Sequence, residues 1–582
     1  MTESMNDERE RSLLVRGGAI HPMDGPAGSA DAPAALVVRG GRILATGTVE
    51  DMSPLAGGDA EVLDVGGATV LPGLIDTHPH LLHYGSLAEP LVDIADARSH
   101  DEIVERIRAR AARTPPGDWV MTTPVGEAHY FIRSSYRDLP EGTLPARDVL
   151  DRATTEHPVV IQAWAPATPN SMALNSAALA RLGIDADTPE RVDNVWIEKD
   201  ADGLPTGRLH GSVNNYYSED PYCSRLWRQI PFLQPDALVP GTKRAVAEYL
   251  RQGVTAVYEN HMMDGPLIDT WRGLRDAGEL TMRVAVAQEA EAYGMPWSRP
   301  RPMEDFMARL QRAADSIETH DDFYRFVGVS VMLDGGCNGG FIRMRRAYKG
   351  PYGEEAHGHD FITLDKAELV MRFAAEHHMR LNIIALGPAA HDDNLAMLDR
   401  VAEAYDITGL GWILVHGFFV EPEHVEHYAR LGFDVTISMS FTFGKGDMLV
   451  ERIGADVMDD FLPLRRFLDA GMAVAAGTDW GPKNPWEQIQ LALTHEFAGS
   501  GRRNLGPAQT VTREEAVAMW TSGGSRLLRW PEIGTLVPGT YADMIVVDRD
   551  PLTADLDDLP GTRVLRTIVD GQVVHDSGDL GG

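Results

Sequence analysis

Two histidines stand one residue apart in the segment PGLIDTHPHLLHYG, which runs from Pro72 to Gly85. The apolar run before them ends in Asp76 and is typical of a short buried strand. Because side chains alternate between the faces of a strand, His78 and His80 are expected to point to the same side. Two imidazoles arranged in this way can bind one metal ion. Taken alone, the motif is about equally compatible with two exposed loop histidines.

Other chemically capable residues close predicted strands farther along the chain. The segment WILVHG ends with His416 before its glycine, and AVAAGTDWG places Asp479 after small and β-branched residues. An acidic residue at the end of an apolar strand is costly to bury unless it is paired or metal-bound. Glu259 and His261 follow the strand in TAVYENHM, and Asp334 follows the strand in GVSVMLDGG. For Asp334 a role in capping the next turn is an equally supported interpretation.

The elements that must position these residues alternate between strands and helices. Candidate strands are HPVVIQAW, GVTAVYEN, RVAVAQEA, FVGVSVMLDGG, RLNIIALG, GWILVHG, FDVTISMS and MAVAAGTD, with helical patterns such as KAELVMRFAAEHH between them. Near-continuous apolar strands separated by helices predict a parallel sheet that is covered on both faces. We therefore predict an α/β fold with a (β/α)8 TIM-like barrel, whose mouth would hold the site. A doubly wound open sheet is the alternative, although no glycine-rich dinucleotide motif is present.

The two ends of the chain differ from the middle. Short β-branched runs punctuated by glycine pairs occur in SLLVRGGAIHPMDG and AALVVRGGRILATG, and the style returns in GTLVPGTYADMIVVDRD. We expect residues 1–72 and 530–582 to form one small composite β-sandwich around a barrel at 73–529. A barrel needs about 250 residues, so we expect an inserted lid at about 86–240. Its aromatic residues, in HYFIRSSY, NNYYSEDPY and SRLWRQIPF, would line a substrate pocket or form the lid's own core.

Composition limits the partners of this 582-residue chain. Its net charge of −33, from 53 basic and 86 acidic residues, disfavours nucleic acid as a partner. Cys223 and Cys337 are too few for a disulfide framework and fit a reducing compartment. Neither a leader-like apolar segment nor a run of membrane-spanning length is present. We therefore expect a cytoplasmic, non-membrane protein that acts on a small-molecule substrate.

The same motifs resemble those of the amidohydrolase superfamily. The segments VLPGLIDTHPHL, ILVHG, AAGTDWGP and IGTLVPGTYADMIVVDRDPL carry this resemblance, which extends to Val574. LNSAAL and PTG are similar to the amidohydrolase-3 branch, which includes N-substituted formamide deformylases. The resemblance implies a metal-bearing barrel with a composite β-sandwich, and a homodimer. It maps His78 and His80 onto metal ligands of the first strand, His416 onto the sixth-strand histidine and Asp479 onto the eighth-strand aspartate.

Two positions depart from the pattern of this branch. Ser330 stands where the branch usually has a fourth-strand lysine that can become a carboxylated metal bridge, and Ile384 replaces the fifth-strand histidine. Isoleucine cannot bind a cation, and serine is a poor substitute for an anionic bridge. We therefore predict a single divalent ion, zinc first, with manganese or iron as alternatives. The predicted ligands are His78, His80, His416, Asp479 and Glu259, with His261 as a less favoured substitute for Glu259.

The predicted chemistry follows from such an ion. It lowers the pKa of its bound water from 15.7 towards about 7, which yields hydroxide at neutral pH. Asp479 would act as general base and then general acid, while His416 would bind the ion or polarise the electrophile. The expected function is hydrolysis of the C–N bond of an amide, formamide or cyclic amide, with small aromatic compounds among the candidate substrates. A metal-dependent lyase or decarboxylase, and a degenerate non-catalytic metal- or ligand-binding protein, are the alternatives.

Overall fold

A computed structural model describes residues 12–25, 32–126, 133–163, 167–215, 220–261, 264–291, 300–317, 319–336, 338–481 and 483–580. The side chains at positions 83, 86, 87 and 266 fall outside this description. Within the described ranges, no helix combines the length and the apolarity that crossing a membrane requires.

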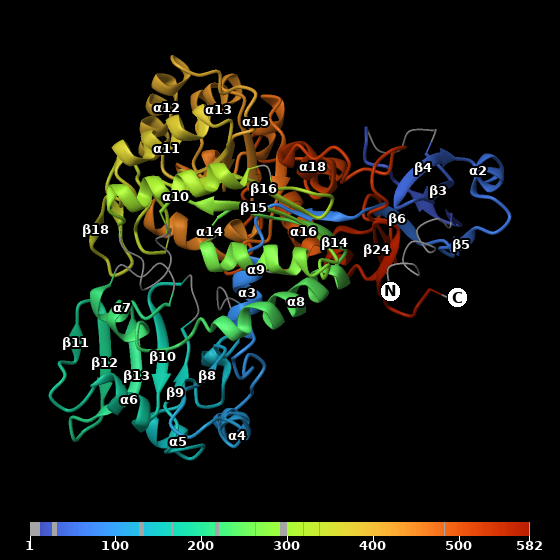
Figure 1. The fold of residues 1–582 in the computed structure, drawn as a ribbon. Helices are drawn as coiled ribbons and strands as arrows, with labels where there is room; N and C mark the ends of the chain where they lie inside the picture. Colours follow the sequence, from blue (N-terminus) through green and yellow to red (C-terminus); the bar gives the residue numbers. More distant parts are fainter. Residues whose placement is uncertain are drawn as a thin grey trace.

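Eight parallel strands form the central sheet, in the order β22-β21-β20-β19-β16-β15-β14-β7. They are β7 (Leu74–Asp76), β14 (Val254–Glu259), β15 (Arg283–Glu289), β16 (Tyr324–Met332), β19 (Arg380–Ile384), β20 (Ile413–Val415), β21 (Asp434–Ile437) and β22 (Val474–Ala476). Backbone hydrogen bonds bring the first and last strands together: Thr77 N donates to Ala476 O at 3.0 Å, and Asp479 N donates to His78 O at 2.8 Å. The predicted α/β barrel is confirmed (Figure 1).

One predicted barrel strand belongs elsewhere, because HPVVIQAW forms β9 (Val159–Ile161) in a separate six-stranded sheet. Its side chains are buried on both faces of that sheet. Val159 and Ile161 pack into one hydrophobic cluster, and Val160 packs into another. A strand covered on both sides is as continuously apolar as a barrel strand, which explains the wrong assignment.

Helices between the barrel strands, and three that follow the last one, pack around the barrel. They are α3 (Leu81–Ala88), α8 (Pro235–Arg251), α9 (Gly265–Asp276), α10 (Met303–Ser316), α11 (Leu364–Glu376), α12 (Pro388–Ala402), α13 (Pro422–Arg430), α14 (Ser440–Arg452), α15 (Leu464–Asp469), α16 (Pro485–Thr494), α17 (Arg513–Ala518) and α18 (Ser522–Leu528). The segment KAELVMRFAAEHH supplies most of α11 as predicted. Its Ala367, Val370, Met371 and Ala374 are buried, which is the spacing of one helix face.

An insertion separates α3 from α8 and forms a lobe of its own beside the barrel (Figure 1). Its sheet has the order β11-β12-β13-β10-β9-β8. Besides β9, its elements are α4 (His100–Ala111), β8 (Val120–Thr122), α5 (Arg147–Asp151), β10 (Asn170–Leu174), α6 (Ser176–Leu182), β11 (Arg191–Val192), β12 (Val195–Lys199), β13 (Pro205–Gly211) and α7 (Pro221–Trp227). These elements lie within the 86–240 range predicted for an insertion.

The ends of the chain form two further sheets: β4-β3-β1-β5, from early strands alone, and β2-β6-β23-β24-β25, in which early and late strands pair. Their bounds are β1 (Leu13–Arg16), β2 (Ala19–Ile20), β3 (Ala35–Arg39), β4 (Arg42–Gly47), β5 (Glu61–Asp64), β6 (Thr69–Pro72), β23 (Met544–Val547), β24 (Val564–Val569) and β25 (Gln572–Asp576). The two sheets share one hydrophobic cluster, to which Val15, Val70 and Val546 contribute. The domain boundaries at residues 72 and 530 stay predictions.

Two features join these terminal sheets to the barrel, one in the backbone and one between side chains. Gly73 links β6 directly to β7, and a Cβ at this position would lie 2.0 Å from Thr255 Oγ1, so the close approach requires glycine. At the start of β15, the buried Arg283 donates to Asp543 Oδ2 at 2.6 Å and to Asp543 Oδ1 at 2.9 Å. The Arg283 guanidinium also lies 3.6 Å from the centre of the Tyr541 ring. The barrel floor and the terminal sheets are therefore coupled by a buried ion pair.

Candidate metal centre

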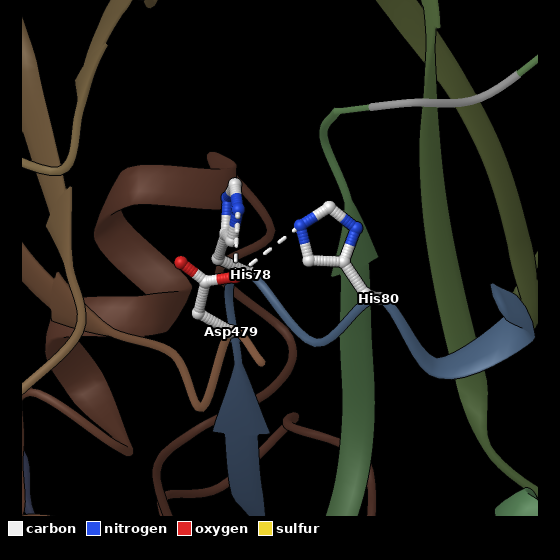
Figure 2. Close-up of side chains that lie close together, drawn as sticks. All are labelled: His78, His80 and Asp479. Atoms are coloured by element: carbon white, nitrogen blue, oxygen red, sulfur yellow. Dashed lines mark ion pairs between the residues drawn. The ribbon is translucent and has the colours of Figure 1, made fainter. Parts of the chain in front are cut away.

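Two imidazoles and one carboxylate meet where β7 and β22 end. Each of His78, His80 and Asp479 offers a ligand atom within 4.8 Å of the other two. Asp479 Oδ1 lies 3.4 Å from His80 Nε2 and 3.9 Å from His78 Nε2. All three side chains are almost fully buried, and Figure 2 shows them converging just past the tip of β7. The structure therefore brings together three of the five predicted metal ligands in one compact group.

The backbone brings these residues together by a route that differs from the predicted strand alternation. β7 ends at Asp76, so His78 and His80 lie in the turn that follows the strand. His80 has φ of 47°, and Asp479 and His416 have φ of 51° and 75°. Non-glycine residues rarely adopt this left-handed conformation. Turns with unusual backbone angles, rather than strand pleating, therefore aim the side chains at one another.

Asp76 holds the two strand ends together and lies outside the compact group of His78, His80 and Asp479. Its carboxylate accepts hydrogen bonds from Thr478 Oγ1 at 2.7 Å, from Thr478 N at 3.2 Å and from His78 N at 3.0 Å. These bonds fix the turn that carries His78 against the turn that carries Asp479. Asp76 thus positions His78 and Asp479 through the backbone of their turns.

Burial sets the charge state of the imidazoles. It lowers the pKa of His78 to about 4 and holds the pKa values of His80 and His416 well below the ordinary value for histidine. Burial alone would raise the pKa of Asp479, but the contact with His80 and the nearby imidazoles outweigh it and hold that pKa well below its usual range. At neutral pH the group therefore holds neutral imidazoles and an ionised carboxylate, the forms that bind metal.

His416 stands beside the compact group, at its edge. Its ring centre lies 4.8 Å from that of His78, and its Nδ1 lies 3.8 Å from Asp479 Oδ2. On its other side the ring meets Phe441 edge to face at 4.9 Å. His416 is therefore in reach of a ligand or substrate held by the three-residue group.

Glu259 lies at the end of β14 and caps the first turn of helix α3. Its Oε1 accepts a hydrogen bond from Leu82 N at 2.9 Å, in the first turn of that helix. Burial raises the pKa of Glu259 to about 7. Among the described residues, its Oε2 has no hydrogen-bond partner. The structure places Glu259 outside the compact group, and its predicted role as a metal ligand stays a prediction.

Asp334 has the capping role that the sequence left open. Its carboxylate accepts hydrogen bonds from Arg343 N and Leu386 N, both at 2.7 Å, and from Gly387 N at 3.1 Å. Burial raises its pKa to about 6. Asp334 therefore organises the loops after β16 and β19.

Two residues near the group were not singled out from the sequence. Lys483 donates from Nζ to Pro79 O, to Asp479 O and, at 3.3 Å, to Thr478 Oγ1. Burial lowers the pKa of Lys483 to about 8, although neighbouring carboxylates oppose this shift. Its position in TDWGPKNP is indistinguishable from that of a surface lysine, so the sequence carries no signal for it.

Trp480 is the second such residue. Its ring stacks on His80 with centres 4.9 Å apart and planes inclined by 17°. The same side chain belongs to the hydrophobic cluster of the insertion, together with Trp227 and Phe232. The core of the insertion therefore extends to the edge of the site, and Trp480 shields one side of His80.

The aromatic residues predicted to line a pocket have mixed outcomes. Tyr222, Trp227 and Phe232 are buried within the insertion, where they form its own core. The aromatic positions at 130, 131, 216 and 217 lie outside the described residues. For the described members of this set, the interpretation as lid core is the one that holds.

The buried donors fit a divalent ion. Neither ring nitrogen of His78 makes a hydrogen bond of standard geometry to a described residue, although the ring is enclosed. Buried polar atoms are normally satisfied, so unsatisfied imidazole nitrogens beside a carboxylate call for a cation. Imidazole and carboxylate are ligands of zinc, iron and manganese. His78, His80 and Asp479 would hold such an ion, with His416 beside it.

Comparison with known proteins fits this arrangement. An amidohydrolase family model of the amidohydrolase-3 type matches residues 61–575. The chain belongs to this amidohydrolase family. It is 28% identical to a protein of Arthrobacter pascens named N-substituted formamide deformylase, across 96% of this chain and 98% of the relative.

Solved structures share the fold of this amidohydrolase. An uncharacterised metal-dependent hydrolase from Pyrococcus horikoshii OT3 has a TM-score of 0.69 at 19% identity, covering 94% of this chain and 99% of the other. An adenosine deaminase from Xanthomonas campestris, solved with bound zinc, has a TM-score of 0.53 at 15% identity, with coverage of 98% and 94%. Family and fold together support a metal-dependent hydrolase in general.

Proposed function

We propose that this amidohydrolase hydrolyses the carbon–nitrogen bond of a small amide, formamide or cyclic amide with the help of one divalent ion. The observation that carries the proposal is the buried group of His78, His80 and Asp479, whose ligand atoms lie within 4.8 Å of one another. The name of the Arthrobacter pascens relative makes N-substituted formamides the first substrates to test. Zinc is the first choice of ion, with manganese and iron as alternatives.

The residues divide the work of hydrolysis. A bound divalent ion supplies Lewis acidity, which lowers the pKa of water from 15.7 to about 7. The Asp479 carboxylate accepts the proton of the attacking water and returns it to the leaving nitrogen. The water oxygen bonds to the carbonyl carbon, the carbon–nitrogen bond breaks, and an acid and an amine are released.

Two neighbours complete the proposed site. His416 Nδ1 lies 3.8 Å from Asp479 Oδ2 and is in place to bind the ion or to polarise the substrate carbonyl. Trp480 stacks on His80 at 4.9 Å and excludes water from that side. Exclusion of water strengthens every electrostatic interaction inside the site.

The test uses the purified full-length protein, its metal content and a panel of substrates. The proposal expects about one equivalent of metal per chain and release of amine from formamides, amides or cyclic amides. Release of carbon dioxide from aromatic acids would instead support the decarboxylase alternative. A metal-free protein, after expression in zinc-supplemented medium, with no turnover of the panel would support the degenerate alternative.

Several further expectations stay predictions. They are a cytoplasmic location, a homodimer, and the absence of nucleic-acid and membrane partners. Sedimentation of the purified protein tests the dimer directly.

A further inference from the structure

A second histidine–carboxylate pair lies next to the metal-binding group, on the neighbouring strands. His261 follows β14 by two residues, and Glu289 is the last residue of β15. His261 Nδ1 and Glu289 Oε2 are 2.9 Å apart, and the two side chains are 3% and 1% exposed. The pair is therefore as deeply buried as the group beside it.

The ring of His261 is close to the two first-strand histidines. Its centre lies 5.9 Å from that of His78 and 5.7 Å from that of His80. For comparison, the rings of His78 and His80 are 4.7 Å apart. Imidazoles that share an ion at about 2.0–2.1 Å have ring centres on the order of 5 Å apart. The ring of His261 is therefore within about 1 Å of this spacing, although its ligand atoms lie outside the compact group.

Glu289 is well placed to supply negative charge on this side of the barrel rim. It pairs in register with Ser330 of the adjacent strand β16. Ser330 is fully buried, and its hydroxyl has no hydrogen-bond partner among the described residues. A divalent ion held by neutral imidazoles and by Asp479 alone would keep one uncompensated positive charge. A second buried carboxylate reduces that cost.

We propose that His261, oriented by Glu289, is a further protein ligand of the ion held by His78, His80 and Asp479. The inference rests on the proposed function, because it presupposes a metal ion at that group. A carboxylate that binds one ring nitrogen of a metal-bound histidine fixes the ring and makes the other nitrogen a better ligand. Because Glu289 Oε2 lies 2.9 Å from Nδ1, His261 would bind the ion through Nε2.

The experiment measures metal affinity rather than turnover. The full-length protein is stripped with a chelator and titrated with Zn(II) against a competing dye. His261→Ala and Glu289→Gln are each expected to weaken Zn(II) binding by about 10- to 100-fold. Glu289→Gln preserves the size and a hydrogen-bond acceptor but removes the charge, which serves if His261→Ala folds poorly. With Co(II) in place of Zn(II), the visible absorption of His261→Ala is expected to differ from that of the parent, because one nitrogen ligand is lost.

A matched control comes from another histidine–carboxylate pair, in which the histidine is buried and the carboxylate is exposed. His424 Nε2 lies 2.9 Å from Asp392 Oδ1 on helices α12 and α13. His424→Ala is expected to change thermal stability but neither Zn(II) affinity nor the Co(II) spectrum.

The outcomes separate this inference from the proposed function. If both His261→Ala and Glu289→Gln bind Zn(II) as tightly as the parent and the Co(II) spectrum is unchanged, the pair is merely structural and the inference is wrong. If the parent itself binds no metal, or if His80→Ala leaves Zn(II) affinity unchanged, the metal centre of the proposed function fails instead.

Discussion

Three residues of the site hold a backbone conformation that side chains rarely adopt. His80, His416 and Asp479 all have φ between 47° and 75°. Such residues cost about 1–3 kcal/mol each and persist where the surrounding structure enforces them. Here the enforcement is visible in the hydrogen bonds between Asp76 and Thr478, which lock the two turns together. At the scale of single residues, the fold accepts backbone strain that orients the side chains proposed to bind the metal ion.

Substitution of Asp479 tests its proposed role without disturbing that conformation. Asparagine tolerates the left-handed region, so Asp479→Asn is expected to fold normally. The change removes the charge and the proton acceptor, and turnover of an active formamide or amide should fall by about 10²- to 10⁴-fold. Circular dichroism checks the fold, and steady-state kinetics checks turnover. The control Asp469→Asn changes an exposed aspartate on α15 and should be silent. Wild-type turnover by Asp479→Asn would exclude it as the base.

Acid stability reports on the buried imidazoles. His78 has a pKa of about 4 in the folded protein, whereas an unfolded histidine titrates near 6.5. Between about pH 6.5 and pH 4 the unfolded chain therefore binds more protons than the folded chain. The free energy of unfolding of the metal-free protein should fall from pH 6.5 towards pH 4, by about 1.4 kcal/mol per pH unit for each such group.

Urea unfolding at stepped pH values measures this slope. His78→Asn removes one titrating ring and should reduce the slope by about 1.4 kcal/mol per pH unit. An identical slope in the variant would mean that His78 takes up its proton in the folded state as well.

At the scale of elements, helix α3 depends on a cap from a different strand. Its N-cap residue, His80, makes no side-chain capping bond, and Glu259 at the end of β14 accepts the hydrogen bond from Leu82 N instead. The carboxylate thus stabilises the helix that follows the histidine pair. This couples the second barrel strand to the turn that holds the site.

Two substitutions of Glu259 separate capping from metal binding. Glu259→Ala loses the acceptor and should lower the free energy of unfolding by about 0.5–2 kcal/mol. Glu259→Gln retains an acceptor and should lose little stability. If Glu259 only caps the helix, Glu259→Gln also leaves Zn(II) affinity intact. A large loss of Zn(II) affinity in Glu259→Gln would instead support its predicted role as a ligand.

At the level of elements, the sequence predicts most strands and helices but not the geometry that depends on contacts between distant segments. All eight barrel strands lie in segments predicted from apolar runs and intervening helical patterns, because those patterns are local. HPVVIQAW was misassigned because burial on both faces leaves the same pattern in any sheet. Glu289 carried a usable signal, since it closes an apolar strand as Asp479 does. Lys483 and the left-handed turns carried none, because a buried lysine and a strained φ depend on contacts between distant segments.

At the scale of the whole molecule, the buried pair of Arg283 and Asp543 ties the barrel to the terminal sheets. Arg283 is fully buried and makes two hydrogen bonds to one carboxylate. Removing one partner leaves an uncompensated charge in the interior. Because Arg283 begins β15 and the metal-binding group lies beyond the strand ends, its effect should fall on stability alone.

Arg283→Met should therefore destabilise the protein by about 3–5 kcal/mol while Zn(II) affinity stays at the parent value. Urea unfolding and dye-competition titration make the two measurements. Arg272→Met, at an exposed pair with Asp269, should cost at most about 0.5 kcal/mol. A double variant with Asp543→Leu should recover part of the loss. Weakened Zn(II) binding in Arg283→Met would show that the junction also shapes the site.

The pairing of early and late strands in one sheet has a consequence for folding during synthesis. β6 runs through Gly73 straight into β7 and the histidine pair, yet one of its two neighbours in the sheet is β23, at Met544–Val547. At about 5–20 residues per second, a ribosome needs roughly 24–95 s to travel between them. Throughout that interval, β6, which directly precedes the histidine pair, lacks its partner strand β23. Binding of the proposed divalent ion is thus expected to follow synthesis of β23, and chains stalled before β23 should be isolated without metal.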